Sequence, residues 1–248
     1  MKLENVVASK KSKRTYRDGN KWIKSFDEKS KVDVLSQALN HALIEETPIK
    51  IPKMLEVNTS EGNYTIITEY VEGVSIQELM DKSPEKLDEY LEMFVDIQMS
   101  IHNNRAPGLK KLKDKMAAKI SLSELDETLK YDLHTRLFSM PKHQKICHGD
   151  LKPSRVIVSD DGEVYITDWA HVTQGNASAD ISRTYLTFCL EGKTELAEKY
   201  LELFCKKSGT TKKYVQRWFP IVAASQTVKK NPQERELLLK WVDVMEGE

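Results

Sequence analysis

Residues 146–158 read Ile-Cys-His-Gly-Asp-Leu-Lys-Pro-Ser-Arg-Val-Ile-Val, and residues 164–169 read Val-Tyr-Ile-Thr-Asp-Trp. Each stretch contains a run of three residues that are common in strands. An Asp-Asp-Gly sequence between the two runs is a turn signal. The pattern therefore predicts a β-hairpin that pairs Val156–Val158 with Val164–Ile166.

An acidic residue lies just outside each end of this predicted hairpin, Asp150 before it and Asp168 after it. Because a hairpin brings its outer ends together, we expect the two carboxylates to face one small volume. Phosphoryl transfer uses one carboxylate to orient or deprotonate the attacking hydroxyl and another to hold a divalent metal ion. Lys152 adds a cation that could meet the phosphoryl group. A surface hairpin with two ordinary turn aspartates is the simpler alternative, but the length of the combined motif favours the chemical interpretation.

These motifs resemble those of the kinase-like superfamily, and most closely its aminoglycoside and choline phosphotransferase branch. His-Gly-Asp at 148–150, rather than His-Arg-Asp, and Asp-Trp at 168–169, rather than Asp-Phe-Gly, indicate this branch. The resemblance implies an α+β, two-lobed protein-kinase-like fold. Residues 1–73 would form a nucleotide-binding lobe with a small antiparallel β-sheet and one helix. Residues 74–248 would form a mainly helical lobe that carries the catalytic loop and the acceptor site.

The composition is that of a soluble globular protein. The 248 residues include 38 basic and 38 acidic side chains, and this neutral balance argues against a dedicated nucleic-acid binder. No apolar run reaches the length of a membrane span. The cysteines at positions 147, 189 and 205 show no metal-ligand spacing, and no signal peptide is evident. We therefore expect a protein of the reducing cytoplasm.

Short strands are predicted at residues 6–8, 15–17 and 21–26, and Lys24 lies in the middle of the third. One interpretation of Lys24 is a solvated residue on the outer face of an edge strand. The resemblance implies instead that Lys24 pairs with the α- and β-phosphates of ATP. Where the family has a Gly-rich loop, residues 9–15 contain no glycine and four cations. Those cations are either a solvated face or a substitute attraction for phosphate.

Helical spacing predicts a helix over residues 31–45. The resemblance implies that this helix offers a glutamate to Lys24, but the residue at the matching register is Gln37, which cannot form an ion pair. Glu45 and Glu46 lie near the end of the helix and are poorly placed for this role.

The resemblance also assigns residues whose own pattern is uninformative. Backbone groups of Glu69, Tyr70 and Val71 would bind adenine as the hinge between the lobes. His148 and Asp180 would support the catalytic loop. Asp180 has a simpler alternative as the N-terminal cap of the helix that follows it.

The main departure from the family pattern is at position 155. The family has an Asn there, five residues after the catalytic Asp, as a second metal ligand, and this chain has Arg155. Arginine has no lone pair for a cation and is always charged. Arg155 would therefore repel a metal ion or contact phosphate directly.

Together these observations predict an ATP-dependent phosphotransferase of the aminoglycoside- or choline-kinase type, with a small-molecule hydroxyl acceptor. ATP and Mg²⁺ are the expected cofactors, with the metal on Asp168, and Asp150 and Lys152 as catalytic residues. The alternative is a pseudokinase-like ligand-binding or regulatory module with impaired metal–nucleotide binding, which Arg155 favours. An RNA binder that uses Lys10–Arg14 is poorly supported, because aromatic residues for base stacking are sparse there. Neither a nucleic acid nor a membrane is expected as a partner.

Overall fold

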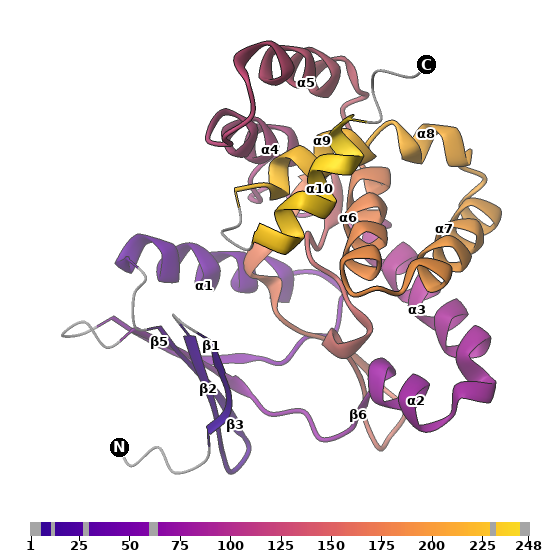
Figure 1. The fold of residues 1–248 in the computed structure, drawn as a ribbon. Helices are drawn as coiled ribbons and strands as arrows, with labels where there is room; N and C mark the ends of the chain where they lie inside the picture. The colour runs from indigo at the N-terminus through magenta and orange to yellow at the C-terminus, as the bar shows by residue number, and fades with distance from the viewer. Residues whose placement is uncertain (1–5, 11–12, 27–29, 60–63, 229–231, 244–248) are drawn as a thin grey trace. The chain divides into compact units, whose positions relative to one another are not determined.

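The computed structural model describes residues 6–10, 13–26, 30–59, 64–228 and 232–243 (Figure 1). The chain divides into two compact units. One contains residues 1–85 and 153–171, and the other contains residues 86–152 and 172–248. The predicted lobe boundary at Gly73 falls inside the first unit.

The first unit is built on an antiparallel sheet with the strand order β1-β2-β3-β5-β4. Its strands are β1 (Val6–Lys10), β2 (Lys13–Asp18), β3 (Lys21–Phe26), β4 (Met54–Asn58) and β5 (Tyr64–Glu69). The three N-terminal strands predicted from sequence are confirmed. β3 is the central strand, so the interpretation of Lys24 as an edge-strand residue is wrong. Neighbours on both sides pair with its backbone.

Helix α1 (Lys31–Glu45) lies against one face of this sheet (Figure 1) and matches the predicted helix in both bounds. Ser30 caps it by accepting a hydrogen bond from the backbone N–H of Asp33. The core between helix and sheet contains Phe26, Val34, Ala38 and Ile66. The larger apolar residues whose spacing predicts the helix are instead exposed, at 75% for Val32, 45% for Leu35 and 58% for Leu39. The helix therefore has two apolar stripes, and it packs on the sheet through the one with the smaller side chains.

A second sheet of the first unit has the order β6-β8-β9, from β6 (Val74–Ser75), β8 (Val156–Val158) and β9 (Val164–Ile166). β8 and β9 pair antiparallel, so the predicted hairpin is confirmed. At Gly73, φ is 153° and an added Cβ would lie 2.3 Å from the carbonyl oxygen of Val158. Only glycine fits this close approach of the two strands. Helix α2 (Ile76–Lys82) follows β6 and begins with a capping box between Ser75 and Glu78.

The second unit is mainly helical. Its helices are α3 (Leu87–His102), α4 (Leu112–Ser121), α5 (Glu127–Ser139), α6 (Ala177–Leu190), α7 (Thr194–Ser208), α8 (Lys212–Gln216), α9 (Phe219–Gln226) and α10 (Pro232–Asp243). Helix α6 is buried from Ala177 through Phe188. It is therefore the central helix, and its polar side chains must find partners inside the protein.

Two antiparallel strands, β7 (Lys145–Cys147) and β10 (Thr173–Gly175), complete the second unit. Helices α8 and α9 follow one another closely in the chain but are separate. Pro220 is in the first turn of α9, where proline favours the start of a new helix.

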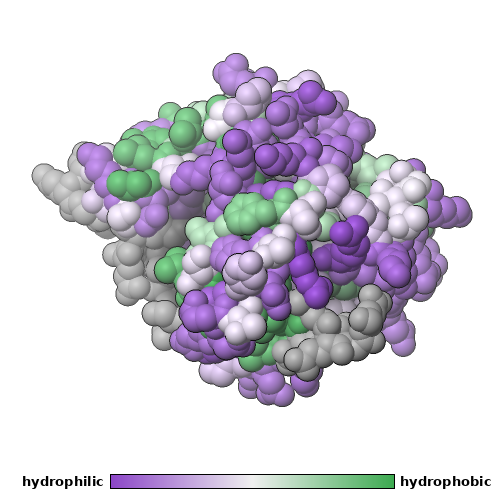
Figure 2. Space-filling view, turned by 90° about the horizontal axis from the view of Figure 1, so that it is seen from above, coloured by the Kyte–Doolittle hydropathy of each residue, from purple (hydrophilic) through white to green (hydrophobic). Residues whose placement is uncertain are grey.

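In the face drawn in Figure 2, hydrophilic residues predominate and apolar residues form small separate groups. Within the described ranges, no helix combines the length and the hydrophobicity that crossing a membrane requires. The three cysteines, all in described positions, are unpaired.

The packing of α1 gives a first prediction. Ile44 is fully buried, whereas Leu39 on the same helix is 58% exposed. Ile44→Ala should lower the free energy of unfolding by about 2–5 kcal/mol, because it leaves a cavity. Leu39→Ala should change it by less than about 0.5 kcal/mol. Urea denaturation of both variants measures the two changes. An equal loss in the free energy of unfolding would contradict the observed packing of α1, in which Ile44 is buried and Leu39 is exposed.

Candidate active site

A cavity of about 610 Å³ lies within the first unit, in the size range of small-molecule sites. Strand alternation explains its lining, because side chains two residues apart share one face of a sheet. The sheet residues around it are Lys13, Thr15 and Arg17 of β2, Trp22 and Lys24 of β3, and Ile66 and Thr68 of β5. Glu69, Tyr70 and Val71, which follow on the chain, line it too. One cavity thus contains both the predicted phosphate lysine and the predicted hinge.

At one end of the cavity, three cations surround a single carboxylate. Lys24 Nζ lies 3.1 Å and Lys13 Nζ 3.8 Å from Asp168 Oδ1, and Arg155 Nη2 lies 3.1 Å from Asp168 Oδ2. All four side chains are at most 28% exposed. Burial alone would raise the pKa of Asp168, but Lys24, Arg155 and Lys13 outweigh it and hold the pKa far below its usual range. Asp168 is therefore a carboxylate at any physiological pH.

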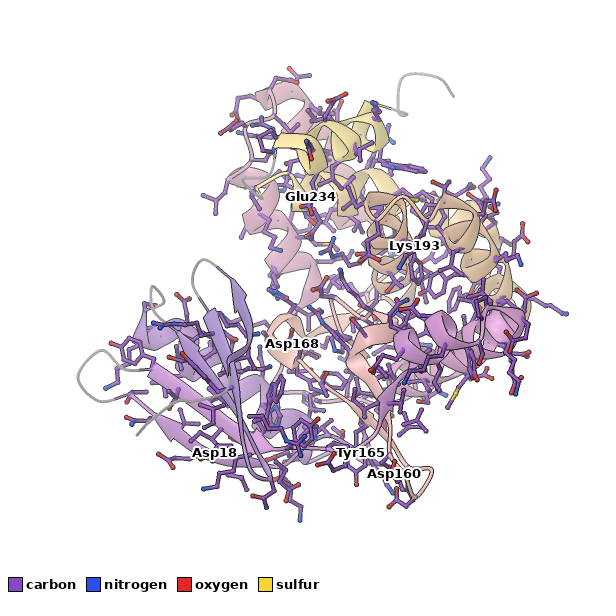
Figure 3. The ribbon with its side chains drawn as sticks, turned by 60° about the horizontal axis from the view of Figure 1, so that its bottom comes forward. Asp18, Asp160, Tyr165, Asp168, Lys193 and Glu234 are labelled. Atoms are coloured by element: carbon purple, nitrogen blue, oxygen red, sulfur yellow. The ribbon has the colours of Figure 1, made fainter. Side chains whose placement is uncertain are left out.

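The hairpin fixes Asp168 and Arg155 close together. Figure 3 shows Asp160 at the turn of the hairpin, Tyr165 in β9, and Asp168 beyond the end of that strand. The backbone N–H and the hydroxyl of Thr167 both donate to the carbonyl oxygen of Arg155, at 2.9 and 3.1 Å. Asp168 itself has a φ of 66°, the one positive value among the described non-glycine residues. Such a conformation is tolerated by Asp and is often found at functional sites.

Lys24 has no glutamate partner from α1 among the described residues. Gln37 is the residue of that helix that lines the cavity, as its register predicts. Glu45 is engaged elsewhere, because it lies 3.5 Å from His41 Nε2 and accepts the backbone N–H of Met54. Lys24 instead pairs with Asp168, with Nζ 3.1 Å from Oδ1.

The opposite end of the cavity is formed by the predicted hinge. The N–H of Glu69 donates to the carbonyl of Lys53 at 2.8 Å, and that of Tyr70 donates to the carbonyl of Asn20 at 2.7 Å. In the described part of the chain, the N–H of Val71 has no such partner. Of the three hinge residues, Val71 is thus the one with a backbone donor left for a ligand. The ring of Trp22 lies 5.7 Å from that of Tyr70 and adds apolar surface beside this donor.

Lys13 belongs to the basic run that stands in place of a Gly-rich loop. The sequence marked this run only as a set of cations, and it gave no reason to single out Lys13. Positions 11–12 of the run lie outside the described residues, and for Ser9 and Lys10 only the backbone is described. The strand period could have identified Lys13, since positions 13 and 15 face the same side as Lys24.

In the second unit, the predicted catalytic Asp150 pairs with Arg183 of α6. Arg183 Nη2 donates to Asp150 Oδ1 at 2.9 Å, and the two side chains are only 7% and 13% exposed. A second cation, Lys119 of α4, interacts with the charges of both Arg183 and Asp150. Burial and the charge of Arg183 lower the pKa of Lys119, and the charge of Asp150 raises it. Arg183 and Lys119 thus place positive charge near Asp150. The sequence did not predict Lys119, because a lysine on an amphipathic helix usually faces solvent.

Asp180 holds the backbone of the loop that carries Asp150. Its Oδ1 accepts the N–H of Gly149 at 2.7 Å, and its Oδ2 accepts the N–H of His148 at 3.2 Å and Nε2 of His102 at 2.9 Å. The side-chain amide of Gln98 donates to the same Oδ2. The N-terminal cap of α6 is Asn176, so the simpler interpretation of Asp180 as that cap is wrong. The loop geometry around His148 thus depends on one buried carboxylate.

Lys152 lies away from this network. Its Nζ is 2.8 Å from Glu191 Oε1 at the C-terminal end of α6, and both side chains are about one-third exposed. Because Asp150 belongs to the second unit and Asp168 to the first, the expectation that they face one volume stays a prediction. The same holds for a phosphate-binding role of Lys152.

The network of Asp180 predicts a pH-dependent loss of stability. Burial alone would raise the pKa of Asp180, but the hydrogen bond and charge of His102 and the N–H of Gly149 lower it overall. A lowered pKa stabilises the folded state above the unfolded pKa of about 3.9, and this contribution is lost as the pH falls through the folded value. Asp180→Asn should therefore lower the free energy of unfolding by about 3–5 kcal/mol at pH 7. The difference in free energy of unfolding between this variant and the wild type should become smaller below about pH 4.

Urea denaturation at pH 7 and at several lower pH values measures this difference. The control is Asp88→Asn, which removes a carboxylate that is 77% exposed and pairs with Lys199. It should cost less than about 1 kcal/mol. A cost for Asp180→Asn that equals the control would show that the buried network does not hold the loop.

Comparisons with known proteins find solved structures of similar fold. The chain is similar to aminoglycoside phosphotransferase APH(4)-Ia, with a TM-score of 0.71 and 13% identity over 97% of this chain and 91% of that one. A thermostable mutant of that enzyme, in ternary complex with AMP-PNP and hygromycin B, matches with a TM-score of 0.70 at 14% identity, over 97% and 91% of the two chains. Choline kinase LicA from Streptococcus pneumoniae matches with a TM-score of 0.67 at 15% identity, over 98% and 94%.

No curated protein sequence matches the chain. The profile of the Phosphotransferase enzyme family (APH), however, matches residues 7–214. This range includes both the cavity residues of the first unit and the Asp150 loop of the second. The protein has the kinase-like fold, and it belongs to the phosphotransferase enzyme family.

Proposed function

We propose that this protein is an ATP-dependent phosphotransferase that transfers the γ-phosphate to a hydroxyl group of a small molecule. The observation that carries the proposal is the cavity of the first unit. It contains three cations at one end and, at the other, the N–H of Val71, which has no backbone acceptor among the described residues. A nucleoside triphosphate needs both features, because its base is recognised by backbone groups and its phosphates by positive charge.

In the proposal, adenine lies beside Val71 and the phosphates contact Lys24 and Arg155. The bound AMP-PNP of the APH(4)-Ia complex supports nucleotide binding by this fold. The sequence predicts that Asp168 binds Mg²⁺. Such binding would compete with the contacts that Asp168 makes to the three cations. A carboxylate oxygen that accepts from ammonium or guanidinium groups has fewer lone pairs left for a metal ion.

The proposed reaction is a single displacement. The acceptor oxygen forms a bond to the γ-phosphorus while the bond to the β–γ bridging oxygen breaks, and ADP leaves. Asp150 orients the hydroxyl and receives its proton, and cations at the phosphates offset the charge that develops during transfer. Arg183 holds Asp150 in one orientation through its 2.9 Å hydrogen bond. Lys152 would have to leave Glu191 before it could contact phosphate.

The acceptor is proposed to be a small alcohol, as for the aminoglycoside and choline kinases of similar fold. Arg183 and Lys119 place positive charge beside Asp150, and Lys115 lies one turn from Lys119 on α4. Burial and the charges of Lys119 and Lys110 lower the pKa of Lys115 to about 8. These charges disfavour a cationic group next to the reacting hydroxyl. An acceptor screen should therefore include phosphorylated and carboxylated alcohols beside aminoglycosides and choline.

A second candidate function is a pseudokinase-like module that binds a ligand or regulates a partner without transferring phosphate. The ion pair between Arg155 and Asp168 favours it, because it occupies a carboxylate that the family uses for the metal ion. Nucleotide binding without phosphate transfer to any acceptor would support this candidate.

The cavity gives a direct binding prediction. Lys24→Met should weaken ATP binding about 10- to 100-fold, because one charge-assisted contact to phosphate contributes about 1.5–3 kcal/mol. The control is Lys21→Met, since Lys21 is an exposed residue of the same strand, β3. It should leave the affinity unchanged. Isothermal titration calorimetry with ATP measures both, and equal affinities of the two variants would exclude Lys24 from the site.

The assignment of Asp150 predicts a separation of binding from transfer. Asp150→Asn should lower the rate of phosphate transfer to an identified acceptor by about 10²–10⁴-fold, the range for loss of a general base. ATP affinity should stay within about threefold of the wild type, because the role proposed for Asp150 is to orient and deprotonate the acceptor hydroxyl and not to bind the nucleotide. Asp160→Ala, at the exposed hairpin turn, is the control. Undiminished transfer by Asp150→Asn would refute the assignment.

A further inference from the structure

The contacts of Asp168 bear on how the phosphates of a nucleotide would be held. Both of its carboxylate oxygens are engaged, Oδ1 by Lys24 and Lys13 and Oδ2 by Arg155. We refer to Lys13, Lys24 and Arg155 as the cation cluster. Its three positive charges and the one carboxylate leave a formal charge of +2, which equals that of one divalent metal ion.

The residues around Asp168 do not fit a magnesium site. Mg²⁺ requires a nearly octahedral set of oxygen ligands and is usually bound by one or two carboxylates together with phosphate and water. Among the residues that the structure describes, no group of three or more His, Cys, Asp or Glu side chains could hold a metal ion, so an ion on Asp168 would need phosphate and water for its other ligands. The position that would supply the second ligand is Arg155, which has no lone pair to donate. A divalent ion on Asp168 would also lie beside three positive charges that repel it.

The cation cluster is suited to phosphate instead. A guanidinium group can donate two parallel hydrogen bonds to phosphate oxygens, and an ammonium group contacts them as a compact charge. The three side chains are 17–28% exposed, so they are partly shielded from water yet accessible from the cavity. Arg155 is held at its backbone by the two hydrogen bonds from Thr167. Lys24 is fixed in the central strand of the sheet. The backbone positions of Arg155 and Lys24 are therefore set before a ligand arrives.

We propose that the cation cluster takes the place of the divalent metal ion, so that the nucleotide binds without Mg²⁺ and Asp168 serves to position the three cations. This inference rests on the nucleotide binding proposed above. It assigns Asp168 a role through its neighbours, since the carboxylate holds Lys24 and Arg155 toward the phosphates. It also explains how nucleotide binding is kept when the family's asparagine is replaced by Arg155.

The test compares AMP-PNP binding by calorimetry in EDTA and in millimolar Mg²⁺. The wild type should bind with affinities that differ by less than about threefold between the two conditions, because the cluster supplies the charge that the metal otherwise provides. Arg155→Asn restores the family's ligand. It should bind about tenfold or more weakly in EDTA and recover in Mg²⁺. Arg155→Lys keeps the charge and should still bind in EDTA.

A spectroscopic measurement gives a second readout. Mn²⁺ added to the AMP-PNP complex should give no protein-dependent electron paramagnetic resonance signal with the wild type, and a bound-ion signal with Arg155→Asn. The control is Arg217→Asn, at an exposed position at the end of α8, which should behave as the wild type in both experiments. Thermal unfolding without nucleotide establishes that each variant is folded.

The outcomes separate the two proposals. Wild-type binding that appears only with Mg²⁺ would overturn the metal-free site and leave the proposed nucleotide function standing. Equal affinities of the wild type and Arg155→Asn in EDTA would also overturn it. No AMP-PNP binding by the wild type in either condition would instead contradict the proposed function itself.

Discussion

The ion pairs of Asp168 are the interaction on which the functional end of the first unit depends. A partly buried carboxylate with two cations on one oxygen and one on the other is stable only if each partner is held in place. Three separate parts of the unit provide these partners. Lys13 and Lys24 come from neighbouring strands of the large sheet, and Arg155 comes from the start of the hairpin. Asp168 therefore ties the sheet to the hairpin, and it does so at the cavity where a ligand would bind.

A corresponding carboxylate organises the second unit. Asp180 is completely enclosed and accepts hydrogen bonds from the backbone of His148 and Gly149, next to Asp150. Asp150 is in turn paired with Arg183, one turn of α6 away from Asp180. In each unit, a carboxylate that is buried or partly buried thus orders the groups around it. The chemistry proposed for the protein requires that order, since transfer depends on positioning and on preorganised charge.

Much of this could be predicted from the sequence, because the strands and helices have clear local signals. The hairpin, helix α1 and the motif acids follow from turn residues, helical spacing and the length of the motif. The ion-pair partners of the charged side chains were harder to predict. Lys13 reaches Asp168 through a long flexible side chain, and Arg183 meets Asp150 only through the packing of α6. The exposed face of α1 was also unpredictable, because its two apolar stripes have the same period and tertiary packing decides between them.

A crystal structure of the protein with AMP-PNP, grown with Mg²⁺ present, tests the central claim most directly. The account predicts adenine at the N–H of Val71 and phosphate oxygens within hydrogen-bond distance of Lys24 and Arg155. It also predicts that Asp168 remains paired to those cations, with no metal ion bound to it. A metal ion coordinated by Asp168, with Arg155 turned away from the phosphates, would contradict the account.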